Sequence, residues 1–292
     1  MTRAPAPASV DLRVQPIDGV LDRVERSLGV QVDRGGLVRK RRSIGARTDR
    51  GTWVRIERRL MERIGGQSWN GTEAAAVLTA VAMPEWIGGV AWRGEEPGAT
   101  VMWRADETEW VPDAPVKPAG TLLADPHLSE AWWSVFNASM DALARQETTR
   151  LATPDTVPAT QTHVSAVIEA AFPGVVDTTI DQWSCAHADL NWANLTAPAC
   201  WFLDWEDWGR APRGLDAATV WGSSLAVPAL ADRVRLERRA DLASRTGKLM
   251  SLFYCAKIAG PGAAADDPLV EPARREADRL IRELQRASGR AE

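Results

Sequence analysis

Acidic and amide side chains stand at the two open ends of a short predicted hairpin in the second half of the sequence. Residues 194–196 and 200–203 can pair as strands across a proline-containing turn. Asp189 precedes the first strand, Asn194 opens it, and Asp204 follows the second. Because a hairpin brings its open ends together, the sequence predicts that these three side chains converge.

Two carboxylates and a carboxamide oxygen are hard oxygen donors, which are the ligands that Mg²⁺ prefers in proteins. Such an ion is typically held by one or two carboxylates together with the phosphate oxygens of a substrate. A carboxylate that remains without a metal could accept a proton from a hydroxyl group. The residue types therefore predict metal-assisted chemistry on a phosphate, with a carboxylate available as a base.

The same segment resembles a known catalytic loop. His187, Asp189 and Asn194 form the pattern H-x-D-x-x-x-x-N of kinases, and Leu-Asp-Trp-Glu follows at 203–206. Together they look like the aminoglycoside phosphotransferase family, which includes related antibiotic, choline and homoserine kinases. The family's later G-P-x-x-x-D-L-A stretch is matched in part, because alanines stand before the proline and after Asp216. The resemblance is strong over 187–216 and loose elsewhere.

The resemblance implies a role for each matched residue. Asp189 would be the catalytic base, and Asn194 and Asp204 would bind the metal ions. His187 and Asp216 would brace the loop. Ala188 replaces the usual glycine, and this substitution requires only that the φ angle of Ala188 be negative. The implied cofactors are ATP (or GTP) and Mg²⁺, and the implied partner is a small molecule with a hydroxyl acceptor.

The roles of other residues in the segment can be interpreted in two ways. Glu206 and Asp207 could contact a cationic substrate such as an aminosugar, or they could be ordinary surface acids. The chain holds 14 tryptophans against one tyrosine. Trp192 and Trp208 flank the predicted site and could stack on a flat substrate, although packing in the core is the commoner role of tryptophan.

The resemblance implies an α+β, bilobal protein-kinase-like fold, with a small antiparallel-sheet N-lobe and a mostly helical C-lobe, and the elements expected around this segment fit it. Expected in the N-lobe are strands at 37–47, 52–58, 88–92 and 99–105 and a helix over 71–82 that Asn70 caps. Expected in the C-lobe are helices at 127–147, 162–171, 249–259 and 272–288. The predicted divisions are a disordered leader at 1–12, a nucleotide-binding N-lobe at 13–106, and a catalytic and acceptor-binding C-lobe at 107–292.

The nucleotide-binding half of the resemblance departs from the family. Arg55 occupies the strand position where the family has a lysine that contacts phosphates and pairs with a helix glutamate, which here would be Glu73. Glu73 could instead cap its own helix, since 70–73 has the spacing of a capping box. No G-x-G-x-x-G motif occurs. Trp103 is expected beside the adenine.

Composition excludes several classes of protein. A net charge of −4 argues against a nucleic-acid binder, and the basic run 39–42 would point to both faces of a strand. The sequence has neither a long apolar run nor a secretion signal, so we expect no membrane span and a cytoplasmic location. The leading hypothesis is an ATP-dependent small-molecule kinase. The alternative is a catalytically retired kinase-fold protein that binds or regulates.

Overall fold

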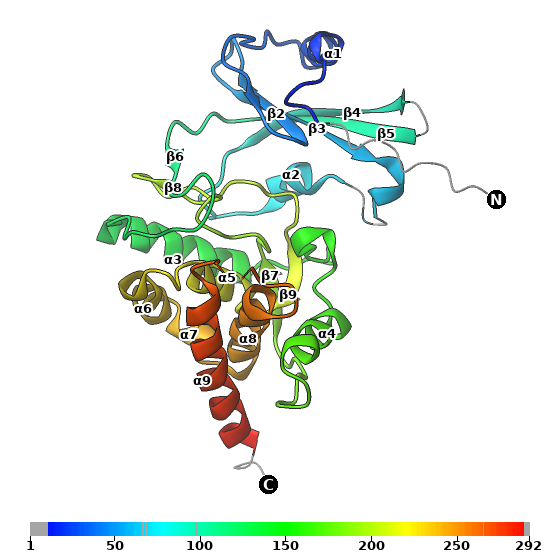
Figure 1. Cartoon of the computed structure of the whole chain (residues 1–292). Coiled ribbons are helices and arrows are strands. Elements are labelled where there is room, and N and C mark those ends of the chain that lie inside the picture. The colour runs from blue at the N-terminus through cyan, green and yellow to red at the C-terminus, as the bar shows by residue number, and fades with distance from the viewer. Residues whose placement is uncertain (1–10, 66, 68, 97–98, 265, 289–292) are drawn as a thin grey trace, which may run out of the picture. The chain divides into compact units, whose positions relative to one another are not determined.

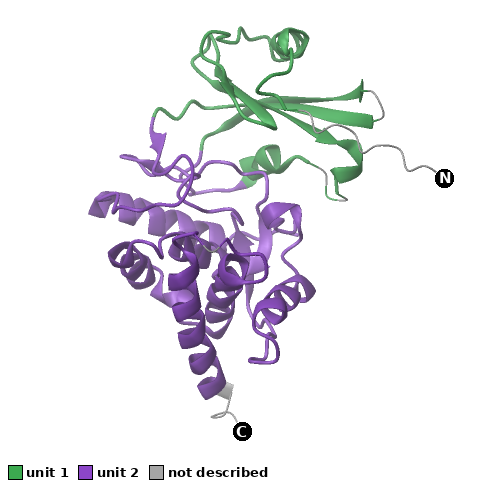
Figure 2. Ribbon diagram, in the orientation of Figure 1, with its two compact units in different colours: residues 1–77, 84–112 green, residues 78–83, 113–292 purple. Residues whose placement is uncertain are grey.

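A computed structural model describes residues 11–65, 67, 69–96, 99–264 and 266–288. Contacts divide the chain into two compact units (Figure 2). Unit 1 comprises residues 1–77 and 84–112, and unit 2 comprises residues 78–83 and 113–292. The boundary lies slightly beyond the predicted one, because the last strand of unit 1 continues to Thr108.

Unit 1 is built on a five-stranded antiparallel sheet with the strand order β1-β2-β3-β5-β4 (Figure 1). The strands are β1 (Val38–Arg39), β2 (Ser43–Arg47), β3 (Trp53–Leu60), β4 (Trp86–Glu96) and β5 (Ala99–Thr108). Gly51 allows the tight turn between β2 and β3, because its φ of 75° is costly for residues with a side chain. The two predicted strand pairs are thus confirmed, but the strand predicted at 37–47 divides into β1 and β2, and the second pair is longer than expected.

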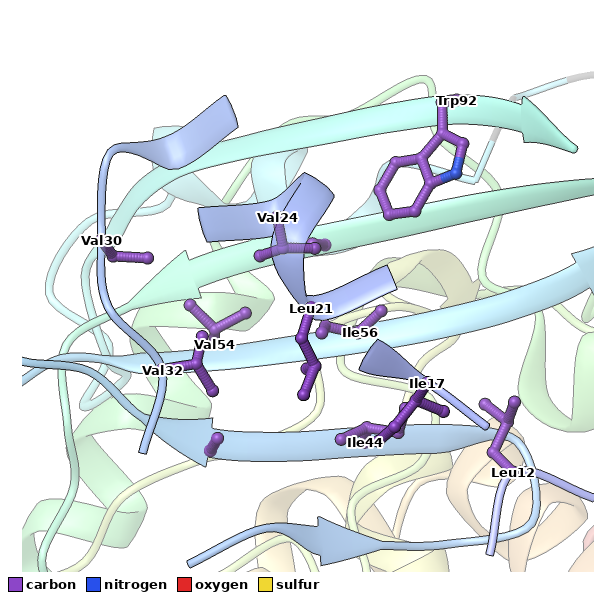
Figure 3. Close-up of a cluster of buried hydrophobic side chains, with 12 residues drawn as sticks. Leu12, Ile17, Leu21, Val24, Val30, Val32, Ile44, Val54, Ile56 and Trp92 are labelled. Carbon is purple, nitrogen blue, oxygen red and sulfur yellow. The ribbon is translucent and has the colours of Figure 1, made fainter. Parts of the chain in front are cut away.

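One face of this sheet is covered by helix α1 (Asp18–Leu28), which sequence reasoning missed (Figure 3). Leu21 and Val24 of the helix pack against Val54 and Ile56 of β3 in a single buried cluster. Since side chains alternate along a strand, Arg55 lies on the opposite face of the sheet. The helix therefore leaves the charged residues of β3 on the face that it does not cover.

The helix predicted over 71–82 is wrong in length. Helix α2 (Gly71–Ala74) continues only as a 3₁₀ turn, η2 (Ala75–Val77), and Asn70 provides no side-chain cap. The residues that follow belong to unit 2 and bond within it. The backbone N–H of Ala82 donates to Ser139 Oγ at 3.0 Å, and its carbonyl accepts the N–H of Phe202 at 2.8 Å. These tertiary hydrogen bonds replace the ones that a longer helix would have made.

Unit 2 is largely helical, and the four helices predicted for it are confirmed with adjusted bounds. Its helices are α3 (Glu130–Ala144), α4 (Gln161–Ala171), α5 (Leu215–Ser223), α6 (Pro228–Glu237), α7 (Arg239–Leu242), α8 (Arg245–Ala259) and α9 (Val270–Ser288). Short 3₁₀ turns are η1 (Met61–Arg63) in unit 1 and η3 (Pro154–Thr156) in unit 2. Helices α5 and α8 are largely buried, and α8 packs against α4, α5 and α9.

Two short strand pairs hold the loops of unit 2. Strand β6 (Ala114–Pro115) pairs with β8 (Thr196–Ala197), and β7 (Trp183–Ala186) pairs with β9 (Gly209–Pro212). Residues 187–195 connect β7 to β8, so the predicted catalytic loop is anchored by strand pairing at both of its ends.

The chain's beginning corrects one prediction. Residues 1–10 of the predicted disordered leader lie outside the described residues, but Leu12 is fully buried and its N–H donates to the carbonyl of Arg41 at 3.0 Å. Leu12 therefore belongs to the core of unit 1. In the part of the chain that the structure describes, no helix combines the length and the apolar character needed to cross a bilayer.

Candidate active site

The predicted hairpin forms and gathers the polar residues of the catalytic segment. Leu195 and Phe202 make an antiparallel bridge, and the N–H of Leu203 donates to the carbonyl of Asn194 at 2.8 Å. The amide nitrogen of Asn194 donates to Asp189 twice, to carboxylate Oδ2 at 2.9 Å and to the backbone oxygen at 2.8 Å. Asn194 and Asp189 are thus in contact, as their spacing predicts.

Asp216 fixes the start of the loop from helix α5. Its two carboxylate oxygens accept the backbone N–H groups of His187 at 2.7 Å and Ala188 at 2.8 Å. Gly214 precedes the helix with a φ of 86°, which turns the chain so that Asp216 enters the first helical turn. Burial raises the pKa of Asp216, while the two donors favour its ionised form. The geometry is that of a structural brace.

His187 connects the loop to the far end of the hairpin. Its ring is completely buried, its Nε2 lies 2.8 Å from the carbonyl of Leu203, and its Nδ1 lies 3.3 Å from the N–H of Asp189. Because a carbonyl can only accept, Nε2 carries the proton and Nδ1 accepts from Asp189. Burial lowers the pKa of His187, so the ring remains neutral. With hydrogen bonds at both ring nitrogens, the neutral His187 positions the loop.

The expectation of a negative φ at Ala188 is wrong. Ala188 has a φ of 74°, in the left-handed region that glycine adopts without strain. An alanine in this region costs about 1–2 kcal/mol. The backbone donors of His187 and Ala188 must both point at Asp216, and this requirement holds the unfavourable angle. The positive φ at this position explains why the family motif has a glycine here, and Ala188 adopts the same conformation at a cost.

Asp189 is more basic than an ordinary aspartate. Burial raises its pKa to about 6, and the negative charge of Asp204 contributes in the same direction. Hydrogen bonds from Asn191 and Asn194 act in the opposite direction and stabilise the ionised carboxylate. Asn191 was not among the predicted residues, although an asparagine two positions after an aspartate is well placed to bond back to it.

Asp204 follows the second hairpin strand with a φ of 70°. This left-handed conformation, which aspartate tolerates better than most residues, turns the chain out of the hairpin. In the described part of the chain, no group of three or more His, Cys, Asp or Glu side chains could hold a metal ion. Asn194 and Asp204 would hold Mg²⁺ only with further oxygens, and such a sparse protein ligand set fits an ion that also binds phosphates.

The residues considered as substrate contacts divide into two groups. Trp192 and Trp208 are both buried, and Trp192 donates from its indole nitrogen to Ser224 Oγ at 3.0 Å. Both belong to the core, so the packing reading of these tryptophans is the one that agrees with the structure. Glu206 and Asp207 are half-buried, and Asp207 accepts from the hydroxyl of Thr153 at 2.8 Å.

In unit 1, the predicted pairing of Arg55 with Glu73 is wrong. Glu73 accepts a hydrogen bond at 3.1 Å from Arg104 on β5, and Arg55 forms an ion pair with Glu57 on its own strand. Arg104 also binds the nearly buried carboxylate of Asp106 with two hydrogen bonds, at 2.7 and 2.6 Å. The charged face of the sheet therefore carries a network that the sequence did not indicate.

The structure also separates Trp103 from Arg55. Trp103 stacks on Trp92 with ring centroids 6.0 Å apart and packs against the cluster that α1 covers. Its side chain thus lies on the face of the sheet opposite Arg55. The two predicted nucleotide contacts are not brought together by unit 1.

Several solved structures are similar to this chain over most of its length. The structure is similar to that of the aminoglycoside phosphotransferase APH(4)-Ia, with a TM-score of 0.58 and 12% sequence identity over 91% of this chain and 99% of that one. The amicoumacin kinase hAmiN gives a TM-score of 0.49 at 10% identity, covering 92% of this chain and 94% of that one. The choline kinase LicA from Streptococcus pneumoniae gives 0.47 at 11% identity, covering 91% and 100%.

No family model and no curated protein sequence matches the chain. The similarity to APH(4)-Ia nevertheless spans nearly the whole of both chains. It includes a five-stranded antiparallel sheet followed by a largely helical part, and the sequence predicts this order of a small sheet and then helices. The chain therefore has the protein-kinase-like fold of the aminoglycoside phosphotransferases.

Proposed function

We propose that this protein is an ATP-dependent phosphotransferase that acts on a hydroxyl group of a small molecule. The observation that carries the proposal is the contact between Asp189 and Asn194, whose carboxylate and amide lie 2.9 Å apart at the open end of the hairpin that leads to Asp204. On a kinase-like fold, this arrangement provides both a base and metal ligands.

Asp189 would accept the proton of the acceptor hydroxyl as that oxygen attacks the γ-phosphorus in line. A pKa of about 6, raised mainly by burial, leaves the carboxylate ionised at neutral pH and more basic than an exposed aspartate. The hydrogen bond from Asn194 keeps the carboxylate oriented. The transferred group would pass directly from nucleotide to acceptor.

Asn194 and Asp204 would hold Mg²⁺. The amide nitrogen of Asn194 is committed to Asp189, which leaves its amide oxygen as the ligand atom. When bound, the ion neutralises charge on the phosphate oxygens. His187 and Asp216 keep the two ligands near the base, because they join the loop to the end of the hairpin.

Arg55 is proposed as the residue of unit 1 that binds nucleotide phosphates, since it lies on the face of β3 opposite α1. Glu73 is proposed to support that face through Arg104, its actual partner. The acceptor is proposed to be cationic, because Glu206 and Asp207 follow the metal-binding segment and Asp155 lies close enough to raise the pKa of Asp189.

The test is a search for product. The purified protein is incubated with Mg-ATP and a panel of aminoglycosides, nucleoside antibiotics and amino alcohols, and phosphorylated product is detected by mass spectrometry. Asp189→Asn should lower the rate by about 10³-fold, a typical effect of losing a general base. Asp232→Asn, the same change on the exposed surface of α6, is the matched control and should retain the wild-type rate. Undiminished transfer by Asp189→Asn would refute the assigned mechanism.

A second candidate is a kinase-fold protein that no longer transfers phosphate. The pairing of Glu73 with Arg104 instead of Arg55 favours this candidate. In the family, the helix glutamate holds the cationic residue that contacts the phosphates, and here Glu73 of α2 does not hold Arg55. Calorimetry with ATP and Mg²⁺ separates the two candidates. Absence of metal-dependent binding at millimolar nucleotide would favour the retired kinase.

A further inference from the structure

A second amide holds the carboxylate of Asp189, and it comes from a residue to which the family motif gives no role. The Nδ2 of Asn191 donates to Asp189 Oδ1 at 2.9 Å, while the Nδ2 of Asn194 donates to Oδ2 at 2.9 Å. Each carboxylate oxygen thus accepts one amide N–H. A carboxylate bound at both oxygens cannot rotate about its Cβ–Cγ bond without breaking a hydrogen bond.

The orientation of the Asn191 amide follows from its other partner. Its Oδ1 accepts the backbone N–H of Ala193 at 2.8 Å. An N–H group can only donate, so the oxygen of the amide must face Ala193 and the nitrogen must face Asp189. The donor that reaches Asp189 is therefore determined by the hydrogen-bond network.

The backbone on either side of Asn191 is held by the core. Leu190 and Trp192 are buried, and the carbonyl of Trp192 accepts the N–H of Lys117 at 2.9 Å. Asn191 itself lies between them and is half-buried. Its short side chain thus has a fixed base from which to bond Asp189, and little freedom to leave it.

We propose that Asn191 is a positioning residue that orients the carboxylate of Asp189 for the acceptor hydroxyl. The inference rests on the proposed phosphotransferase function. Two lone-pair positions of the carboxylate are occupied by amides, and the remaining ones stay available for the acceptor. Without Asn191, Asn194 alone would hold the group, and the carboxylate could turn about that single bond.

Asn191 also closes a turn, so a structural role has to be separated from positioning. Asn191→Asp does this, because an aspartate keeps the oxygen that accepts from Ala193, while it loses the donor to Asp189 and places a carboxylate there. A turn function alone would tolerate the change, since aspartate forms such turns as well as asparagine. A positioning function would not, because a second carboxylate then faces Asp189.

The experiment measures kcat, the KM for ATP and the melting temperature of wild type, Asn191→Ala and Asn191→Asp, with the acceptor found in the panel or with water as acceptor. We expect kcat to fall about 10-fold or more in both variants, with the KM for ATP within about two-fold. Asn137→Asp is the matched control, because the amide of Asn137 likewise donates to a carboxylate, Glu237, on a different helix. It should keep the wild-type kcat.

A double-mutant comparison tests whether Asn191 acts through Asp189. In the background of Asp189→Asn, adding Asn191→Ala should lower the residual rate by less than about two-fold. A further 10-fold loss in that background would overturn the inference, and so would full kcat in Asn191→Asp.

A crystal structure of Asn191→Ala supplies a readout that does not depend on turnover. The carboxylate of Asp189 should be rotated or disordered, and one that keeps its orientation would overturn the inference. If the wild-type protein produces no phosphorylated product, the proposed function fails, and this structure still decides whether Asn191 orients Asp189.

Discussion

The proposed catalytic segment of unit 2 and the charged face of the sheet in unit 1 are built in different ways. In the catalytic segment, Asp189 is bonded by two asparagines that follow it within five residues. On the sheet face, Arg104 joins Asp106 on its own strand to Glu73, which lies 31 positions earlier in the chain. One site is assembled within a loop, and the other requires helix α2 to lie against strand β5.

This difference decides which contacts a sequence can predict. A hairpin and its flanking turns bring near neighbours together, so spacing alone indicates that Asp189 and Asn194 meet. The partner of a strand residue depends on which residue of another strand lies opposite, as Asp106 lies opposite Arg55. A shift of the register by one residue would send every side chain to the other face.

The strongest test of the comparison replaces two arginines of the sheet separately. Arg104→Ala should destabilise the protein by about 3 kcal/mol, because it leaves the nearly buried Asp106 without its cation. Arg55→Ala should instead raise the KM for ATP about 10-fold with little loss of stability, since Arg55 is about one-third exposed. Urea denaturation and steady-state kinetics measure both effects.

Each variant serves as the control of the other. If Arg104→Ala raised the KM for ATP while leaving stability intact, the assignment of phosphate binding would move from Arg55 to Arg104. If neither changed the KM, the sheet face would have no role in nucleotide binding.

The second test concerns pH and the loop. The pKa of Asp189 is raised from 3.8 to about 6 in the folded protein, so folding becomes less favourable as the pH rises through this interval. Asp189→Asn cannot lose this proton. Its stability relative to wild type should therefore increase between about pH 4 and pH 6, by up to about 3 kcal/mol, and remain constant at higher pH.

Urea denaturation of both proteins at a series of pH values measures this difference. Asp232→Asn on the exposed surface of α6 is the control and should show a small difference across the same range. If the difference in stability between Asp189→Asn and wild type did not change with pH, burial would not raise the pKa of Asp189.

The smallest expected effect compares one substitution at two positions of the loop and its strand. Ala188→Gly should stabilise the protein by about 0.5–1 kcal/mol, because glycine adopts the φ of 74° without strain. Ala186→Gly, in the buried strand β7, should destabilise it by about 1 kcal/mol. Thermal unfolding measures both changes, and the same sign at both positions would contradict a strained loop.

Much of the fold and of the catalytic loop could be predicted from sequence. Strand alternation and helical periodicity are local signals, and they locate the sheet and the main helices of unit 2. Helix α1 carried such a signal as well, since Ile17, Leu21, Val24 and Leu28 recur at helical spacing.

The remaining features depend on tertiary context. The end of α2 is decided by hydrogen bonds of Ala82 to Ser139 and Phe202, which no local preference reveals. The φ of Ala188 follows from two N–H groups that must both reach Asp216. The partner of Glu73 depends on how helix α2 lies against strand β5. Long-range constraints override propensity in each case.

The bond between the ring of His187 and the carbonyl of Leu203 has a consequence for local opening of the protein. It connects the loop that carries Asp189 to the residue before Asp204, so neither side can move away while the other remains. Asp216 adds the two backbone amides at the start of the loop to the same unit. Fluctuations that expose this region to solvent would therefore release Asp189, the proposed base, and Asp204, the proposed metal ligand, in one cooperative event, and amide protons throughout the segment would exchange together.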